Sequence, residues 1–156
     1  MCMSKVVVLN YQNDHDYRLI GLHTPLEDFR LAFFLNSCFN IQLKRFDDDL
    51  DFESSNAHFS LFTYDCQQTF SSWSLISNKY HYISKVAADS NLFSEQPQTS
   101  VLIREKSKVD YFLKIEADFS TREVEDIVTK INSIKSVVTS YSMNPKSLKS
   151  KDFLIF

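Results

Sequence analysis

The residues that could most readily do chemistry lie close together in residues 102–118, and they are Glu105, Asp110 and Tyr111. Carboxylates and a phenol are groups that catalytic and binding sites use. The sequence supplies no nucleophile, base and oxyanion donor around them, as a reaction site would require. An aspartate at a turn has a structural reason to be there, because its carboxylate accepts nearby backbone N–H bonds. We therefore favour a turn-and-rim role, and keep a groove that holds a partner as the functional alternative.

Two other polar clusters invite a metal interpretation. Residues 14–16 read DHD, but in an extended chain the histidine points away from both aspartates. Residues 47–51 read DDDLD and lack the glycine that a calcium loop of the EF-hand type needs for its turn. Cys2, Cys38 and Cys66 are odd in number and without CxxC spacing, which indicates free thiols in a reducing compartment. We expect no metal and no cofactor.

The composition of the chain argues against three further classes of function, which are nucleotide binding through a glycine-rich loop, general nucleic-acid binding and membrane insertion. Gly21 is the only glycine among 156 residues, so neither a P-loop nor a GxGxxG loop can form. The net charge of −3 lacks the basic excess of a general nucleic-acid surface. The apolar stretch 31–39 is far shorter than the ~20 residues of a membrane span. The chain is therefore expected to be cytoplasmic, without a nucleic-acid or membrane partner.

The elements that position these residues begin with a predicted helix over residues 24–39. Thr24 suits the N-cap, Pro25 the first helical position, and Glu27 the third residue of a capping box. The apolar residues of this helix cover well over half of its circumference, which one sheet would not require. We expect Phe29, Phe33 and Phe34 to be covered by a second element of the chain or by a second protomer, and therefore predict a homodimer.

A second helix is predicted from residues 119–121 onward, with Ser120 and Glu123 as its capping box and apolar residues at 124, 127, 128, 131 and 134 on one face. Alternation predicts strands at 17–23, 41–46, 58–64, 73–76, 100–103, 109–116 and 136–143, of which 58–64 and 73–76 form a hairpin; residues 5–9 fit a strand or a helix start. Residues 47–55 are expected to be a loop and 78–100 a long polar excursion.

Two strand–helix–strand units with antiparallel strands between them predict one α+β domain over residues 1–156. Its sheet is mostly antiparallel, and both helices lie on one face. Residues 144–156 form a tail with a basic part and an apolar tip. We expect the tip, including Phe153 and Phe156, to dock on the core of this chain or on a partner.

Residues 103–111 read IREKSKVDY and resemble the signature of the IPExxxVDY family of small bacterial proteins. Five positions match, and Arg104 stands in place of the proline of the family. The resemblance extends to DYRLIGL, HFSLFTY, WSLISNK and FLKIE, and so spans most of the chain. It implies no catalytic residues, because no established activity accompanies the signature.

These observations predict a non-enzymatic cytoplasmic interaction or regulatory module that forms a homodimer. Its candidate interaction surface comprises Phe29, Phe33, Phe34, Glu105, Asp110, Tyr111, Phe153 and Phe156. One alternative is a small-molecule sensor of ACT-like outline, although the loop after the first strand lacks the glycine of such sensors. Another is an RNA-associated protein that uses Lys146, Lys149 and Lys151 in the tail.

Overall fold

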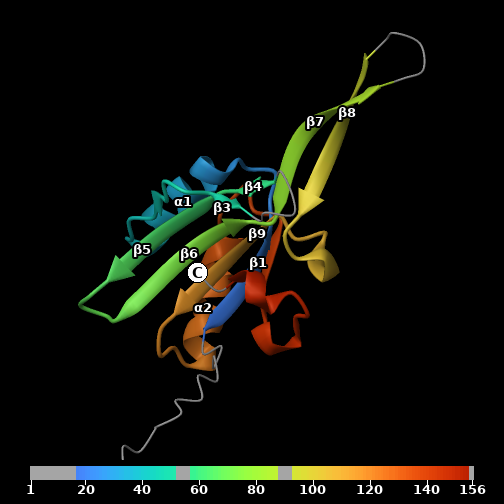
Figure 1. Cartoon of the computed structure of the whole chain (residues 1–156). Helices are drawn as coiled ribbons and strands as arrows, with labels where there is room; N and C mark the ends of the chain where they lie inside the picture. The colour runs from blue at the N-terminus through green and yellow to red at the C-terminus, as the bar shows by residue number, and fades with distance from the viewer. Residues whose placement is uncertain (1–16, 52–56, 88–92, 155–156) are drawn as a thin grey trace, which may run out of the picture.

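The structure is a computed structural model that describes residues 17–51, 57–87 and 93–154. Within these residues, six strands form one antiparallel sheet in the order β10-β1-β9-β6-β5-β2 (Figure 1). Their bounds are β1 Arg18–His23, β2 Lys44–Arg45, β5 Leu61–Cys66, β6 Ser71–Ser77, β9 Tyr111–Glu116 and β10 Thr139–Met143. Two separate pairs are β3 Leu50–Asp51 with β4 His58–Phe59, and β7 Lys79–Ala87 with β8 Phe93–Val101. The predicted α+β class is confirmed.

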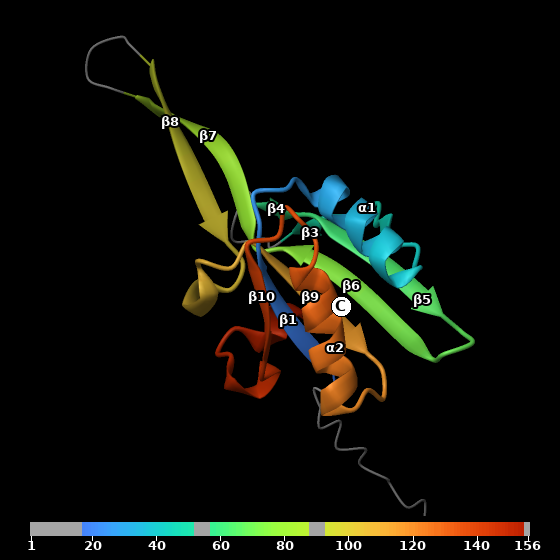
Figure 2. The ribbon, with the colours of Figure 1, turned by 180° about the vertical axis from the view of Figure 1, so that it is seen from behind.

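Both helices, α1 (Asp28–Phe39) and α2 (Thr121–Asn132), cover the same face of the sheet (Figure 2). The alternation of each strand places every second side chain on this face, where it meets the apolar side of a helix. The resulting core joins Leu31 and Leu35 of α1, Ile127 and Ile131 of α2, and sheet residues that include Ile20, Leu22, Leu75, Leu113 and Ile115. The prediction of two helices on one face is therefore confirmed.

The helix α2 connects strands that are not neighbours. β9 and β10 both pair antiparallel with β1, which lies between them, so β9–α2–β10 is a split βαβ unit. The predicted capping box at its beginning is confirmed, because the N–H of Glu123 donates to the Ser120 hydroxyl and the Glu123 carboxylate accepts from the N–H of Ser120. The other unit, β1–α1–β2, ends at the far edge of the sheet.

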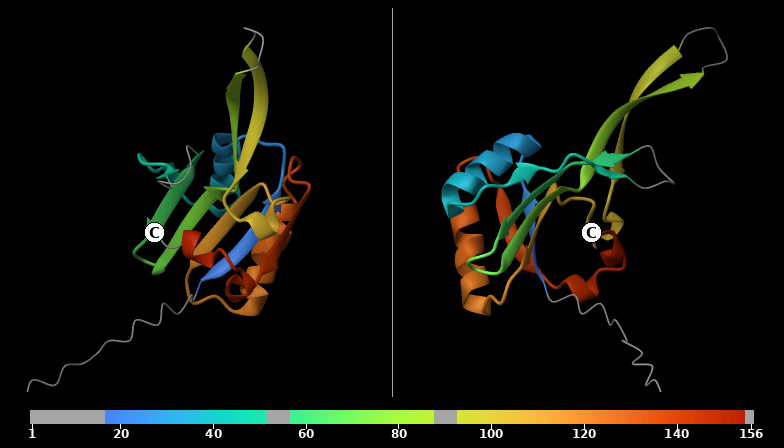
Figure 3. Two further views of the ribbon diagram at one scale, coloured as in Figure 1. Left: turned by 45° about the vertical axis from the view of Figure 1, so that its right-hand side comes forward. Right: turned by 60° about the vertical axis from the view of Figure 1, so that its left-hand side comes forward.

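The opposite face of the sheet has a second core, which the C-terminal tail covers (Figure 3). The tail contains two short 3₁₀ helices, η2 (Pro145–Ser147) and η3 (Lys151–Leu154). Leu148 and Leu154 are buried against this face, and the ammonium of Lys114 donates to the carbonyl of Leu154 over 2.9 Å. The tail therefore docks on its own chain through these residues. Phe153 is partly exposed, and Phe156 lies outside the described residues.

The predicted beginning of the first helix is wrong. Glu27 is the N-cap of α1, without a capping bond from its side chain, and Thr24 lies before the helix. The hydroxyl of Thr24 donates to the carbonyl of Ser136 and accepts from the N–H of Leu26, while its own N–H donates to Asp110. These tertiary contacts use the groups that a local capping box would have needed.

Three strand and loop predictions are also corrected. The strand expected over 41–46 is limited to β2, and the loop expected over 47–55 contains β3, with 52–56 outside the described residues. The polar excursion expected over 78–100 is instead the β7–β8 hairpin. Side chains on both faces of this hairpin meet solvent, so the alternation of buried and exposed residues that reveals a strand is weak there.

Candidate interaction site

The signature segment 103–111 is held by a buried asparagine that sequence reasoning missed. Asn78 is 0% exposed and lies between β6 and β7. Its side-chain amide donates to the carbonyls of Lys106 and Val109 over 2.9 and 2.8 Å, and its side-chain oxygen accepts from the N–H of Ile103 over 2.8 Å. An asparagine offers both donors and an acceptor, which a closed turn of backbone requires. Asn78 therefore fixes the signature segment against the sheet.

Asp110 connects two elements that are distant in sequence. One carboxylate oxygen lies 2.7 Å from the ammonium of Lys79 at the beginning of β7, and the other accepts from the N–H of Thr24 over 2.9 Å. The N–H of Asp110 also donates to the carbonyl of Leu22 in β1. The base of the β7–β8 hairpin and the segment before α1 are thus tied to one side chain.

Tyr111 is buried, and its hydroxyl donates to the carbonyl of Leu26 over 2.7 Å. Burial, and then the carboxylates of Asp28, Asp110 and Glu27, raise the pKa of Tyr111 above its usual value. The phenol therefore stays protonated and keeps its role as a donor to the turn before α1.

Glu105 is in the 3₁₀ helix η1 (Arg104–Lys106) and holds the C-terminal tail. Its carboxylate accepts from the N–H and the hydroxyl of Ser150 over 2.7 and 2.9 Å. Desolvation raises the pKa of Glu105, but the hydrogen bonds from Ser150 and from the backbone N–H groups of Glu105 itself and Lys149 together outweigh it, so that the pKa lies below the usual value. The charged form of Glu105 is therefore the one that fits the tail.

The structure separates the candidate residues into two groups. Glu105, Asp110 and Tyr111 make contacts within the chain, to the tail, the hairpin base and the turn before α1. Tyr111 is buried, whereas Phe29, Phe33 and Phe34 are exposed. The partners of the first group, which are Lys79, Thr24, Leu26 and Ser150, carry no local sequence signal that points to them. The turn-and-rim role favoured from the sequence differs from these contacts, because Asp110 bonds to residues of other elements and Tyr111 is buried.

The exposed face of α1 forms the second group, which we call the phenylalanine face and define as Phe29, Phe33 and Phe34. These side chains are 57%, 66% and 39% exposed, whereas Leu31, Ala32 and Leu35 on the other side of the helix are buried. The rings of Phe33 and Phe34 meet edge to face with centroids 5.8 Å apart. Residues 31–39 carry no charge, but the exposed Arg30 precedes Phe33 and Phe34 by three and four residues and so lies on the same side of the helix.

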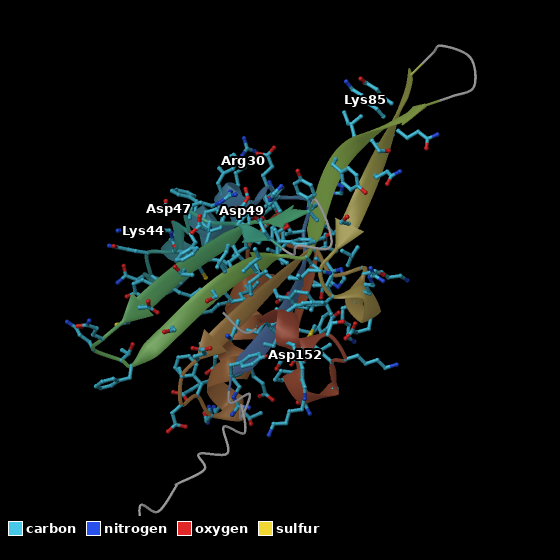
Figure 4. The ribbon with its side chains drawn as sticks, viewed as in Figure 1. Arg30, Lys44, Asp47, Asp49, Lys85 and Asp152 are labelled. Atoms are coloured by element: carbon cyan, nitrogen blue, oxygen red, sulfur yellow. The ribbon has the colours of Figure 1, made fainter. Side chains whose placement is uncertain are left out.

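Charged residues surround α1 (Figure 4). The guanidinium of Arg45 in β2 lies 3.2 Å from the carboxylate of Asp28, at the beginning of α1, and 2.5 Å from the carboxylate of Asp49. Such exposed pairs each contribute only about 0–1 kcal/mol to stability. An apolar centre with a charged rim is the composition that protein interfaces share.

The remaining candidates are placed elsewhere. A cavity of about 860 Å³ lies where β1 begins and β10 ends, and Arg18, Asp118, Ser142 and Lys146 are among its lining residues. Lys149 is exposed on the tail, and Lys151 begins η3. Among the described residues, no group of three or more His, Cys, Asp or Glu is placed to hold a metal ion.

In the part of the chain that the structure describes, no helix is both long and apolar enough to cross a membrane. No protein-family model matches the chain, and no curated protein or solved structure matches it significantly. The resemblance to the IPExxxVDY signature therefore stays a prediction.

Proposed function

We propose that this protein is a non-enzymatic cytoplasmic interaction module, and that it forms a homodimer through the phenylalanine face of α1. The observation that carries the proposal is the exposure of three neighbouring phenylalanines on a helix whose other side is fully packed. Natural surfaces rarely leave large apolar side chains together in water, and such patches mark contact sites.

The size of the face fits the centre of an interface. The exposed fractions of Phe29, Phe33 and Phe34 amount to roughly 300 Å² of apolar surface, taking ~200 Å² for each side chain. A standard interface buries about 800 Å² on each partner and has an apolar core within a polar rim. A second copy of the chain offers the same three phenylalanines, so a two-fold contact brings apolar surface against apolar surface, with Arg30 of each chain beside it.

The test is the molar mass by size-exclusion chromatography with light scattering, from 1 to 100 µM protein. We expect a dimer for the wild type and at least tenfold weaker dimerisation for Phe29→Ser/Phe33→Ser, since each buried phenylalanine contributes ~1.5–3 kcal/mol. Phe70→Asn is the matched control, because Phe70 is 89% exposed at the β5–β6 turn, away from α1. A monomeric wild type, or an unchanged dissociation constant in the double variant, would refute the proposal.

A further inference from the structure

The β7–β8 hairpin stands away from the body of the molecule as a two-stranded arm (Figure 1). Each strand has nine residues, which at ~3.3 Å per residue makes the arm about 30 Å long. Its base is fixed by the contact between Lys79 and Asp110. An isolated two-stranded hairpin is marginally stable in water, and a third strand normally completes it. The arm is therefore an element that gains from an added strand.

The pairing register shows which backbone groups of the arm face outward. Ile83 lies opposite Pro97, which has no N–H to donate. The two residues therefore form a non-hydrogen-bonded pair, in which the backbone N–H and C=O groups point away from the other strand. The N–H of Leu102, directly after β8, donates to the carbonyl of Asn78, directly before β7. The backbone groups of even-numbered residues in both strands therefore point toward the other strand of the arm. Since the pattern alternates, the N–H groups of His81, Ile83 and Lys85 point to the outer edge of β7.

The two outer edges of the arm differ. Pro97 occupies the middle of β8 and removes an outward N–H there, which is a common way to prevent strand addition. β7 has no proline, and Ile83 in its middle is 65% exposed. On the same strand, Tyr80 and Tyr82 stack with ring centroids 5.9 Å apart. One edge is thus blocked against pairing, and the other has the composition of a paired strand.

We propose that the outer edge of β7 pairs antiparallel with β7 of a second copy, to form a four-stranded ribbon in the order β8-β7-β7-β8. The choice of a second copy follows from closure. A two-fold pairing of β7 leaves only the two β8 edges outside, and both carry Pro97, so addition stops at two chains. A foreign strand on β7 would instead present a new open edge of its own.

This inference rests on the homodimer proposed above and adds a second contact to it. The phenylalanine face supplies roughly 300 Å² of the ~800 Å² that a standard interface needs from each partner. The arm supplies further area together with directional backbone hydrogen bonds, which an apolar helix face lacks.

The test is amide hydrogen exchange by NMR of the full chain at about 1 mM and after dilution to the lowest measurable concentration. We expect the amides of His81, Ile83 and Lys85 to be protected at least tenfold more at the high concentration. Ile83→Pro removes one outward N–H, as Pro97 does on β8, and should abolish this protection at His81 and Lys85. The inward amides of Tyr82 and Ser84 report whether the hairpin itself remains formed.

Two control variants test whether the backbone N–H of Ile83 or its side chain is needed, and whether the contact uses the edge of β7 or that of β8. Ile83→Thr keeps the N–H and the β-branched shape, and should retain the protection. Glu95→Pro changes an exposed residue on the edge of β8 that Pro97 already blocks, and should also retain the protection. Outward amides that exchange equally fast at both concentrations, while light scattering shows a dimer, would overturn the arm contact alone. A monomeric wild type would overturn both the arm contact and the proposed homodimer. A Phe29→Ser/Phe33→Ser variant that still dimerises like the wild type and keeps its outward amides protected would overturn only the helix contact.

Discussion

Replacement of the buried Asn78 by alanine should destabilise the protein strongly. The variant keeps both backbone bonds of residue 78, to Asp110 and Leu102, but loses the three bonds of the side chain. The carbonyl of Lys106 still accepts from the N–H of Val109. The buried N–H of Ile103 and the carbonyl of Val109 lose their side-chain partner.

The expected loss follows from these two groups. Each buried polar group that loses its partner costs about 1–3 kcal/mol, so the loss of partners for two groups should lower the free energy of unfolding by about 2–6 kcal/mol. That is a large part of the 5–15 kcal/mol typical of a domain. In urea, with a mid-range slope of ~2 kcal/mol/M, the midpoint should move down by about 1–3 M.

The assay is equilibrium urea unfolding followed by tryptophan fluorescence, since Trp73 lies in the first core. Gln98→Ala is the control, because it removes only an exposed bond from the hydroxyl of Tyr82 and should change stability by less than ~0.5 kcal/mol. Hydrogen exchange should also show residues 102–110 opening before the rest of the sheet. A loss below ~1 kcal/mol in Asn78→Ala would refute the reasoning that this side chain holds the signature segment.

Two further predictions concern pH. The hydroxyl of Thr69, followed by backbone N–H groups of the turn and the Tyr64 side chain, lowers the pKa of Cys66 to about 7. The rate of iodoacetamide alkylation at Cys66, identified by comparison with Cys66→Ser, should therefore be half-maximal near pH 7. Thr69→Val should move this midpoint to higher pH, and an unmoved midpoint would contradict the role of the Thr69 hydroxyl. The lowered pKa of Glu105 means that its contribution to stability is complete above the usual value of 4.5 and is lost as pH falls through the folded value. Glu105→Gln should reduce the acid-dependent loss of stability in urea unfolding between about pH 5 and 3, and an identical pH profile in wild type and variant would count against the Ser150 contact.

The sequence predicts best where one local signal decides the structure. The apolar stripe and capping box of α2 both lie within its own residues, and the structure has the helix as expected. The β5–β6 hairpin was also predicted, because one face of its strands is buried and the alternation is visible. The beginning of α1 was missed because Thr24 bonds to Asp110 and Ser136, more than 80 residues away. Local pattern cannot include such partners.

The arm was missed for the opposite reason, since none of the side chains described at 79–85 and 95–101 is fully buried, and the half-buried and exposed positions of β7 do not coincide with apolar and polar residue types. Its strand character lies in β-branched and aromatic residues such as Tyr80, Tyr82 and Ile83, mixed with polar ones. The exposed phenylalanines were named from the sequence because the apolar set of the first helix is too wide for one sheet. The contacts of Glu105, Asp110 and Asn78 required the fold, because each partner comes from another element.

The position of Arg104 gives a physical meaning to the one mismatch in the signature. Arg104 is the first residue of η1, directly after the N-cap Ile103. A first helical residue has no partner for its N–H within the helix, and proline has a backbone angle that suits this position. A proline there would fit the same local structure, so the arginine changes the rigidity of the turn and leaves its geometry in place. Of the other residues that match the signature, Ile103 and Val109 are buried in the second core. Glu105, Asp110 and Tyr111 form hydrogen bonds to residues of other elements. In this chain, residues 103–111 form a junction between the arm, α1 and the tail, whereas the proposed contacts with a second copy lie on other surfaces.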